Sequence, residues 1–278
     1  MPNEFDKLAP LDRLRAENEF LRFKLMLENG AEFKSMPGAE FSPQIENHFL
    51  NYIVAFEKQA AHPVYTTVFK KIGEPNVFAP AASVPDADIE STLEKLFKHL
   101  GKFGITVSVC SPNVSARELY RFIVEELFQQ DIDDINMPGM VYNFIYDEFH
   151  PDAVYDNTML VEDDLLRDIF GKNELFFRVH YAKDGFLFNG HIYTDWSDYE
   201  MKVQRFKSLF DEIALEQSAV SSCLVDGNRC LVTGEYKAVG VTGGQRSIFQ
   251  GSFTVKLEKG YLDYWEFIEI NLAGFSIE

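Results

Sequence analysis

Two stretches near the end of the chain decide the fold: AVSSCLVDGNRCLVTGEYKAVG at residues 219–240 and SIFQGSFTVKLEKGYLDYWEF at residues 247–267. Each contains two apolar or aromatic runs joined by turn-forming residues, Asp226-Gly227-Asn228 in the first and Glu258-Lys259-Gly260 in the second. Such residues favour tight connections between antiparallel strands. With Thr242-Gly243-Gly244 as a third turn, the pattern predicts four long antiparallel strands at residues 215–225, 229–241, 246–257 and 261–272.

Two further strands and a helix are predicted just upstream. The runs FFRVHYA (176–182) and FLFNGHIYT (186–194) are separated by Lys183-Asp184-Gly185, and Asp-Gly between such runs indicates a hairpin. Residues 196–213 have apolar side chains at helical spacing. We therefore predict that residues 155–278 form one curved antiparallel sheet of about six strands, with the 196–213 helix across it and no helix within 215–272.

The first half of the chain is predicted to be rich in helix. Apolar spacing, proline starts and glycine stops predict helices over 10–29, 43–60, 88–101, 116–130 and 160–171, and alternation predicts one short strand over 105–109. Residues 31–42 have no period and form a linker. The fold class is α+β, with an N-terminal helical arm and linker at 1–37, an α-rich domain at 38–154 and the sheet domain at 155–278. The 10–29 helix either docks on its own domain or dimerises.

The order of elements in residues 155–278 resembles the cone-shaped nuclear transport factor two-like fold, whose relatives include ketosteroid isomerase, scytalone dehydratase and the SnoaL-like (cystatin-like) polyketide cyclases. The resemblance rests on the repeated pattern of strand, Asp-Gly turn and strand, followed by a final aromatic strand. It implies a curved sheet with helices on its concave face and a pocket where helix and sheet diverge. The fold supports enzymes, binding modules and interaction domains alike. The N-terminal half resembles only uncharacterised bacterial proteins.

Composition excludes several classes of function. Among 278 residues, 26 Lys and Arg against 44 Asp and Glu give a formal charge of −18, which disfavours binding to nucleic acid. No signal peptide, lipidation signal or membrane-spanning run is present, so we expect a cytoplasmic protein without a membrane partner. Three scattered cysteines indicate neither a disulfide framework nor a zinc site. Cys110 is interpreted as a buried small side chain, and we expect no cofactor.

Four residues are the candidate acid–base groups. In the second run of the hairpin, Tyr193 and Asp195 reach the point where the 196–213 helix begins. In the last strand, Tyr264 and Glu266 are two residues apart and therefore share a face. A carboxyl group in an apolar pocket has a raised pKa and can exchange protons beside a carbonyl group. The alternatives are a solvent-facing polar strand face, an outward glutamate, and a helix-capping role for Asp195.

Acidic side chains also cluster around residues 125–152, where Glu148 and His150 are weak candidates for metal ligands. They would share a face if residues 141–149 were extended. Carboxylates and imidazole together can bind a divalent cation. A solvated acidic loop explains the same cluster in so acidic a chain. The cluster comprises Glu125, Glu126, Asp131, Asp133, Asp134, Glu148, His150 and Asp152.

Two classes of function follow. The first is a non-enzymatic protein whose C-terminal domain binds a small, apolar metabolite or mediates self-association. The second is an isomerase, dehydratase or cyclase that uses the four acid–base candidates. We also expect a homodimer or larger assembly, because the aromatic side chains of the sheet outnumber what one helix can cover. These are Phe186, Phe188, Phe249, Phe253, Tyr264 and Trp265.

Overall fold

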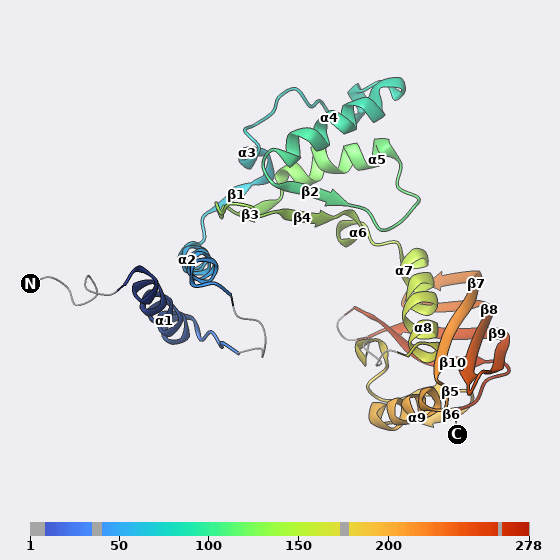
Figure 1. The fold of residues 1–278 in the computed structure, drawn as a ribbon. Helices are drawn as coiled ribbons and strands as arrows, with labels where there is room; N and C mark the ends of the chain where they lie inside the picture. The colour runs from blue at the N-terminus through green and yellow to red at the C-terminus, as the bar shows by residue number, and fades with distance from the viewer. Residues whose placement is uncertain (1–8, 35–40, 173–177, 261–262, 278) are drawn as a thin grey trace, which may run out of the picture. The chain divides into compact units, whose positions relative to one another are not determined.

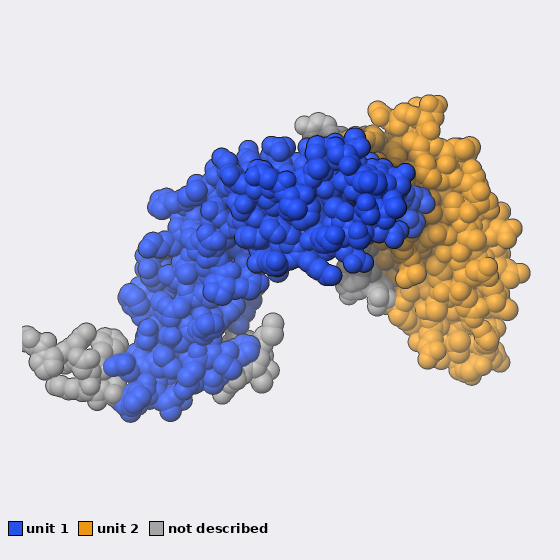
Figure 2. Space-filling view, turned by 90° about the horizontal axis from the view of Figure 1, so that it is seen from above, with its two compact units in different colours: residues 1–149 blue, residues 150–278 orange. Residues whose placement is uncertain are grey.

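A computed structural model describes residues 9–34, 41–172, 178–260 and 263–277 of the chain (Figure 1). The chain divides into two compact units, residues 1–149 and residues 150–278, which Figure 2 colours separately. The second unit thus begins at residue 150, whereas the sequence placed the start of the sheet domain at residue 155. Within the described residues, no helix combines the length and the apolar character that crossing a bilayer requires.

Unit 1 starts with two helices at the predicted positions, α1 (Pro10–Asn29) and α2 (Pro43–Ala60). Asn47, near the start of α2, donates a hydrogen bond at 2.9 Å to Asn18 in the middle of α1, and Asn29 at the end of α1 donates at 2.8 Å to Glu57 near the end of α2. The two helices therefore run in the same direction. Their shared core contains Leu21, Leu25 and Leu50.

The α1–α2 pair has the features of a short parallel coiled coil within one chain. The residues of α1 that face α2 are Asn18, Leu21 and Leu25, and the half-buried Leu14 extends their spacing to the four-three-four pattern of a heptad seam. An ion pair between Arg22 and Glu46 lies beside this seam. The buried Asn18, paired with the half-buried Asn47, fixes the register of the two helices in such a seam, at a cost in stability. Of the two alternatives for the 10–29 helix, docking within its own unit is thus observed.

The rest of unit 1 is built around a second core. The helix predicted over 116–130 is present as α5 (Ala116–Arg121), the π-turn η4 (Phe122–Glu126) and the 3₁₀ turn η5 (Leu127–Gln129), which contribute the buried Tyr120 and Leu127. It packs beside α4 (Ile89–Gly101), the third predicted helix. The remaining elements of unit 1 are short: α3 (Val68–Lys71), η2 (Ala81–Ser83), η3 (Asp86–Asp88) and α6 (Tyr146–Phe149).

Unit 1 contains more strand than the sequence predicted. The predicted strand is present as β2 (Ile105–Ser108), and it pairs in parallel with β4 (Tyr142–Ile145). In addition, β1 (Tyr65–Thr67) pairs antiparallel with β3 (Asp131–Asp133). Each of these strands has only three or four residues, and only β2 has a recognisable alternating pattern in the sequence.

Unit 2 is a six-stranded sheet with helices over one face (Figure 1). The predicted long strands are β7 (Glu212–Asp226), β8 (Arg229–Thr242), β9 (Gln245–Lys259) and β10 (Trp265–Leu272). The first two turns lie where predicted, whereas Glu258 and Lys259 of the third belong to β9, and β10 begins at Trp265 and not at residue 261. A continuous helical segment packs on β7: α7 (Ala153–Met159), η6 (Leu160–Leu166) and α8 (Arg167–Phe170). As predicted, the described residues between 215 and 272 contain no helix.

The prediction for the hairpin was wrong in its position. The first predicted strand, 176–182, lies partly outside the described residues, and its remainder begins with the 3₁₀ turn η7 (Arg178–His180). The second predicted strand is itself the hairpin, β5 (Phe186–Phe188) and β6 (His191–Tyr193), which turns at Asn189-Gly190. Asn189 has φ +47° and Gly190 φ +79°, the backbone that an Asn-Gly turn supplies with little strain.

The prediction of a purely antiparallel sheet was also wrong. The strand order is β6-β5-β10-β9-β8-β7, and β10 pairs in parallel with β5. A parallel pair requires a long connection between its strands, and here α9 (Trp196–Ser208) and the three strands β7 to β9 form it. The helix predicted over 196–213 ends at Ser208, and Glu212 already begins β7.

The aromatic side chains of the sheet are mostly covered within unit 2. Phe186, Phe188 and Phe253 are buried, and Phe249 and Trp265 are half-buried against the same core. The covering residues come from α8, α9 and the segment after β10, where Phe170, Phe206 and Phe275 lie in ring contact with one another. The expectation that these sheet aromatics form an exposed, dimer-forming face was therefore wrong for this face.

Candidate functional site

The four predicted acid–base residues lie in different environments. Tyr193 is buried, with its ring stacked on Phe186 at 5.7 Å. Asp195 caps α9, because its carboxylate accepts a hydrogen bond from the Ser197 backbone N–H at 2.9 Å. Tyr264, just before β10, is 54 % exposed, whereas Glu266 is half-buried in β10. The four residues therefore differ in exposure and in their present contacts, and their shared catalytic role stays a prediction.

The acidic residues of unit 1 are used mostly in structural contacts. Residues 146–149 form the helical turn α6 and are not extended, so the condition for Glu148 and His150 to share a strand face is not met. Asp147 accepts hydrogen bonds from the backbone of Cys110 and Ser111, at 2.6 and 2.9 Å. Among the described residues, no group of three or more His, Cys, Asp or Glu side chains is arranged to hold a metal ion.

Unit 2 contains a group of ionisable side chains that the sequence analysis missed. Asp164 and Asp168 lie one turn apart on η6 and α8, and Lys207 on α9 is only 2 % exposed. Burial raises the pKa of Asp164, an effect that His180 partly opposes, and burial lowers the pKa of Lys207, which Asp168 opposes. Groups with opposite shifts of this kind are found both at active sites and in buried structural networks.

Two buried tyrosines lie beside these charges. The rings of Tyr181 and Tyr199 are 5.4 Å apart, and burial raises the pKa of both phenol groups. Both are therefore protonated near neutral pH and can donate a proton or hydrogen bond, but neither can act there as a base. Two signals for this group of ionisable side chains were available in the sequence. Asp164 and Asp168 are at helical spacing, and Lys207 lies four residues after Val203.

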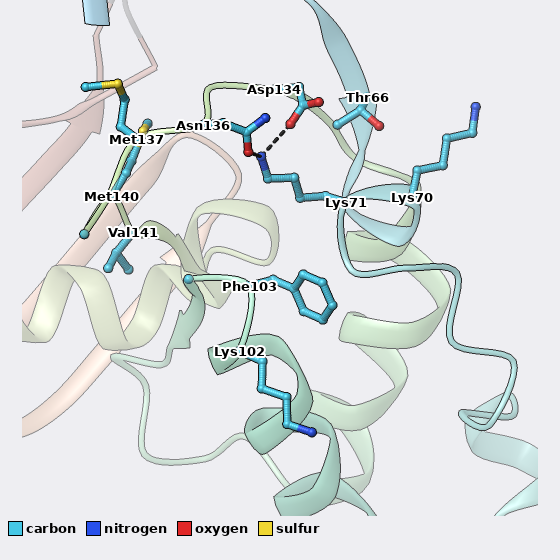
Figure 3. A pocket seen from close by; sticks show the side chains of 12 residues that line it. Thr66, Lys70, Lys71, Lys102, Phe103, Asp134, Asn136, Met137, Met140 and Val141 are labelled. Atoms are coloured by element: carbon cyan, nitrogen blue, oxygen red, sulfur yellow. Dashed lines mark hydrogen bonds and ion pairs between the residues drawn. The ribbon is translucent and has the colours of Figure 1, made fainter. Parts of the chain in front are cut away.

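Unit 1 contains an open hollow of about 640 Å³ with a cluster of lysines around it (Figure 3). Lys70 and Lys71 come from α3, and Lys102 follows α4. The Lys71 ammonium group lies 2.5 Å from the Asp134 carboxylate and 3.0 Å from the Asn136 side-chain oxygen. The other lining residues are Thr66, Phe103, Gly104, Met137, Gly139, Met140 and Val141.

The charge of this hollow is opposite to that of the chain. Its lining contains three lysines and one aspartate, whereas the whole chain has a formal charge of −18. Within the described part of the chain, Lys70 and Lys102 form no ion pair, so their positive charges are not neutralised locally. Figure 3 shows Lys70 and Lys102 at opposite sides of the hollow, with Phe103 between Lys102 and Lys71.

One glycine in the wall is required by geometry. Gly104 has φ +68°, and a Cβ atom there would lie 2.7 Å from the carbonyl oxygen of Met140. Any other residue would push the segment before β2 away from the segment before β4. The wall of the hollow therefore depends on this close approach of two backbone segments.

A second hollow, of about 560 Å³, lies between α8 and β7 in unit 2. Its charged lining residues are already paired: Arg167 with Asp163 at 2.9 Å, and Glu216 with Lys237 and Arg246, both at 2.7 Å. The charges of this hollow are therefore largely compensated within the protein, unlike those of the lysine-lined hollow.

Comparison with known proteins finds similarity at the level of solved structures. Neither a protein-family model nor a curated protein sequence matches the chain. A nuclear transport factor 2-like superfamily protein from Salmonella enterica shares 14% identity, with a TM-score of 0.37 over 44% of this chain and 90% of that one. A protein from Kribbella flavida shares 15% identity, with a TM-score of 0.36 over 46% of this chain and 95% of its own.

A candidate ketosteroid isomerase from Shewanella frigidimarina shares 14% identity, with a TM-score of 0.33 over 44% of this chain and 96% of its own. Nuclear transport factor 2-like and ketosteroid isomerase-like proteins are the class that the sequence resemblance named. Each likeness covers less than half of this chain and is one of fold, not of activity.

Proposed function

We propose that the protein binds a small anion in the lysine-lined hollow of unit 1. The observation that supports this most directly is the three lysines, Lys70, Lys71 and Lys102, that line a concave site in a chain of charge −18, two of them without an ion pair among the described residues. A concave site whose charge differs in sign from the surrounding protein attracts ions of the opposite charge. Lys71 is held by Asp134 and so shapes the hollow, leaving Lys70 and Lys102 for the ligand.

The lining also defines the class of ligand. A volume of about 640 Å³ is in the range of metabolite sites. The ammonium groups suit a carboxylate or phosphate, and the side chains of Phe103, Met140 and Val141 offer apolar contact to the rest of the molecule. The proposed ligand is therefore a small carboxylate or phosphate with an apolar portion.

Isothermal titration calorimetry on the full chain tests this proposal, with inorganic phosphate, citrate and octanoate as probes. We expect at least one probe to bind, with an affinity that falls as salt is raised, because exposed charges are screened. The double variant Lys70→Gln, Lys102→Gln should weaken binding about tenfold or more. The control Lys95→Gln changes an exposed lysine of α4 outside the hollow and should leave binding unchanged. Equal losses in both variants, or no binding by any probe, would refute the proposal.

A second candidate function belongs to unit 2. The sequence predicted that this domain binds a small apolar metabolite or self-associates, or else that it is an isomerase, dehydratase or cyclase. The acid–base alternative is favoured by one observation, the half-buried Asp164 and Asp168 near the buried Lys207, with the pKa of Asp164 raised and that of Lys207 lowered by burial. Tyr193, Asp195, Tyr264 and Glu266 stay predictions in this role, as does a cytoplasmic location.

Deuterium exchange tests the acid–base alternative without knowledge of the substrate. The protein is incubated in D₂O with a panel of small ketones, and loss of the proton next to the carbonyl group is followed by NMR. An enzyme of this kind should accelerate the exchange, and Asp164→Asn should abolish the acceleration. Asp163→Asn, which removes a neighbouring carboxylate paired with Arg167, is the matched control. Exchange at the uncatalysed rate for every ketone would count against this alternative.

A further inference from the structure

Helix α1 carries a second apolar seam on the side opposite α2. Ala16, Phe20, Phe23 and Leu27 follow the same four-three-four spacing as the seam that packs on α2, displaced by two residues. Two residues correspond to about 200° around a helix, so the two seams lie on opposite faces. We call these four residues the phenylalanine stripe.

The phenylalanine stripe is exposed to solvent. Phe20, Phe23 and Leu27 are 64, 59 and 70 % exposed. Adjacent large apolar side chains that follow a heptad pattern are typical of helix–helix contacts, whereas isolated exposed apolar residues need no explanation. Because α1 already packs on α2 through its other seam, the stripe is available for a further helix.

The charges of α1 indicate which helix can occupy it. The helix contains four acidic residues and four basic ones, so its net charge is zero in a chain of charge −18. Two copies of the chain can therefore meet at α1 without the repulsion that their other, acidic surfaces impose. The charged residues are Asp12, Arg13, Arg15, Glu17, Glu19, Arg22, Lys24 and Glu28.

The order of those charges also selects an orientation. In an antiparallel pair centred between Leu21 and Arg22, Phe20 packs against Phe23 of the second copy. Glu17 and Lys24 are seven residues apart and flank the stripe on the same side, so this arrangement places Glu17 near Lys24 of the second copy, twice. A parallel pair would instead place Glu17 near Asp12 of the second copy, a like-charged contact that opposes the favourable one between Glu19 and Lys24.

We propose that two copies of this chain associate through an antiparallel contact between their α1 helices along the phenylalanine stripe. The contact is isologous, so it closes after two copies and forms a dimer. The exposed parts of Phe20, Phe23 and Leu27 amount to about 300–400 Å² per copy, roughly half of what each partner buries in a standard interface. A weak dimer that depends on protein concentration is therefore expected.

Light scattering on the full chain is the first test. Between about 1 and about 300 µM, the range in which so small an interface can form, the mass should rise from 31.9 kDa towards twice that value. The double variant Phe20→Glu, Phe23→Glu should remain a monomer throughout, with unchanged helical circular dichroism. Ile248→Glu, at an exposed apolar position of β9, is the matched control and should behave as the unaltered chain. A mass of 31.9 kDa at every concentration, or equal behaviour of the two variants, would overturn the proposal.

A charge swap then tests the partner and the orientation together. Glu17→Lys alone, or Lys24→Glu alone, places like charges together across the antiparallel contact and should raise the dissociation constant about tenfold. The double variant Glu17→Lys, Lys24→Glu should restore the affinity, because each new charge again meets its opposite in the second copy. Failure of the double variant to recover would exclude the antiparallel contact, as would single variants that have no effect.

Discussion

The buried Asn18 provides the sharpest test of the coiled-coil arrangement of α1 and α2. Asn18 is 2 % exposed, and its amide donates to the Pro43 carbonyl oxygen at 2.9 Å and to the Glu46 carboxylate at 3.1 Å. Its oxygen accepts from Asn47 at 2.9 Å. The substitution Asn18→Ala removes all three hydrogen bonds and leaves the Pro43 carbonyl and the Asn47 amide without this partner.

The expected loss follows from these three bonds. A hydrogen bond contributes about 1 kcal/mol net, and a bond to a charged group somewhat more, so their loss costs about 3 kcal/mol. The better helix propensity of Ala offsets roughly 0.5 kcal/mol of this. We therefore expect the free energy of opening of the α1–α2 pair to fall by about 2.5 kcal/mol, which accelerates amide exchange about 70-fold.

Hydrogen exchange followed by mass spectrometry measures this effect locally. Peptides from α1 and α2 should exchange faster in Asn18→Ala, whereas peptides from β8 and β9 should be unchanged. Asn29→Ala, which breaks only an exposed bond to Glu57, is the control and should have little effect. Asn47→Ala combined with Asn18→Ala should cost less than the sum of the two single variants, because both remove the same bond. Full additivity, or no acceleration in Asn18→Ala, would refute the paired arrangement.

Three further predictions concern packing, thiol chemistry and pH. Phe170 is fully buried, and its ring lies 4.9–5.2 Å from two other aromatic rings. Phe170→Ala should therefore lower the free energy of unfolding of unit 2, measured by urea denaturation, by about 3–5 kcal/mol. A loss below about 1 kcal/mol would contradict this packing. Cys110 is exposed, which corrects the sequence interpretation, whereas burial raises the pKa of Cys230 to about 12. Ellman's reagent should therefore modify Cys110 first in the folded protein, and a fast phase that persists in Cys110→Ser would contradict this order. Hydrogen bonds from Lys256 and Asn271 lower the pKa of Glu269 in the folded protein. The stabilisation from this contact is therefore fully present above the unfolded-state pKa of the carboxyl group. It disappears as the pH falls through the lower, folded-state pKa. In Glu269→Gln the loss of stability with falling acidic pH, measured by urea titration, should be smaller, and identical pH profiles would exclude this contribution.

Long regular elements were predictable from the sequence because their patterns repeat many times. The helices α1, α2 and α4 and the four long strands all extend over at least eight residues, so periodicity and turn residues agree. Among the short strands, alternation predicted β2, whereas β1, β3 and β4 could not be found in this way. Their pairing joins segments far apart in the chain, such as Tyr65 with Asp133, and no local pattern records it.

The hairpin shows how two competing turn signals are decided. Asp184-Gly185 and Asn189-Gly190 both favour a turn, and the sequence analysis chose the first. In the structure the second is the hairpin turn, because the Asn189 side chain also forms hydrogen bonds with the same chain at and just after the end of β10. Its side chain accepts from the Leu272 N–H at 2.7 Å and donates to the Phe275 carbonyl oxygen at 2.7 Å. Contacts with residues more than 80 positions away were not visible in the local sequence.

The candidate sites were predicted less well than the fold. Asp195 and Tyr193 were placed correctly at the start of α9, but helix capping and core packing already account for their positions. The lysine-lined hollow joins α3, the end of α4 and the segment before β4, three parts of the chain that only the tertiary structure brings together. Sequence alone shows Lys70-Lys71 and Lys102 as ordinary charged residues.

The place of β10 in the sheet has a consequence for the biosynthesis of the protein. This strand is the last of the six to be synthesised, yet it lies in the interior of the sheet between β5 and β9. Until it leaves the ribosome, the β5–β6 hairpin has no neighbour and β9 presents an open edge. Unit 1 can fold while translation continues, because all of its elements precede residue 150. Unit 2 must instead remain unfinished until β10 is synthesised, and during that interval the open edge of β9 is exposed to pairing with other chains.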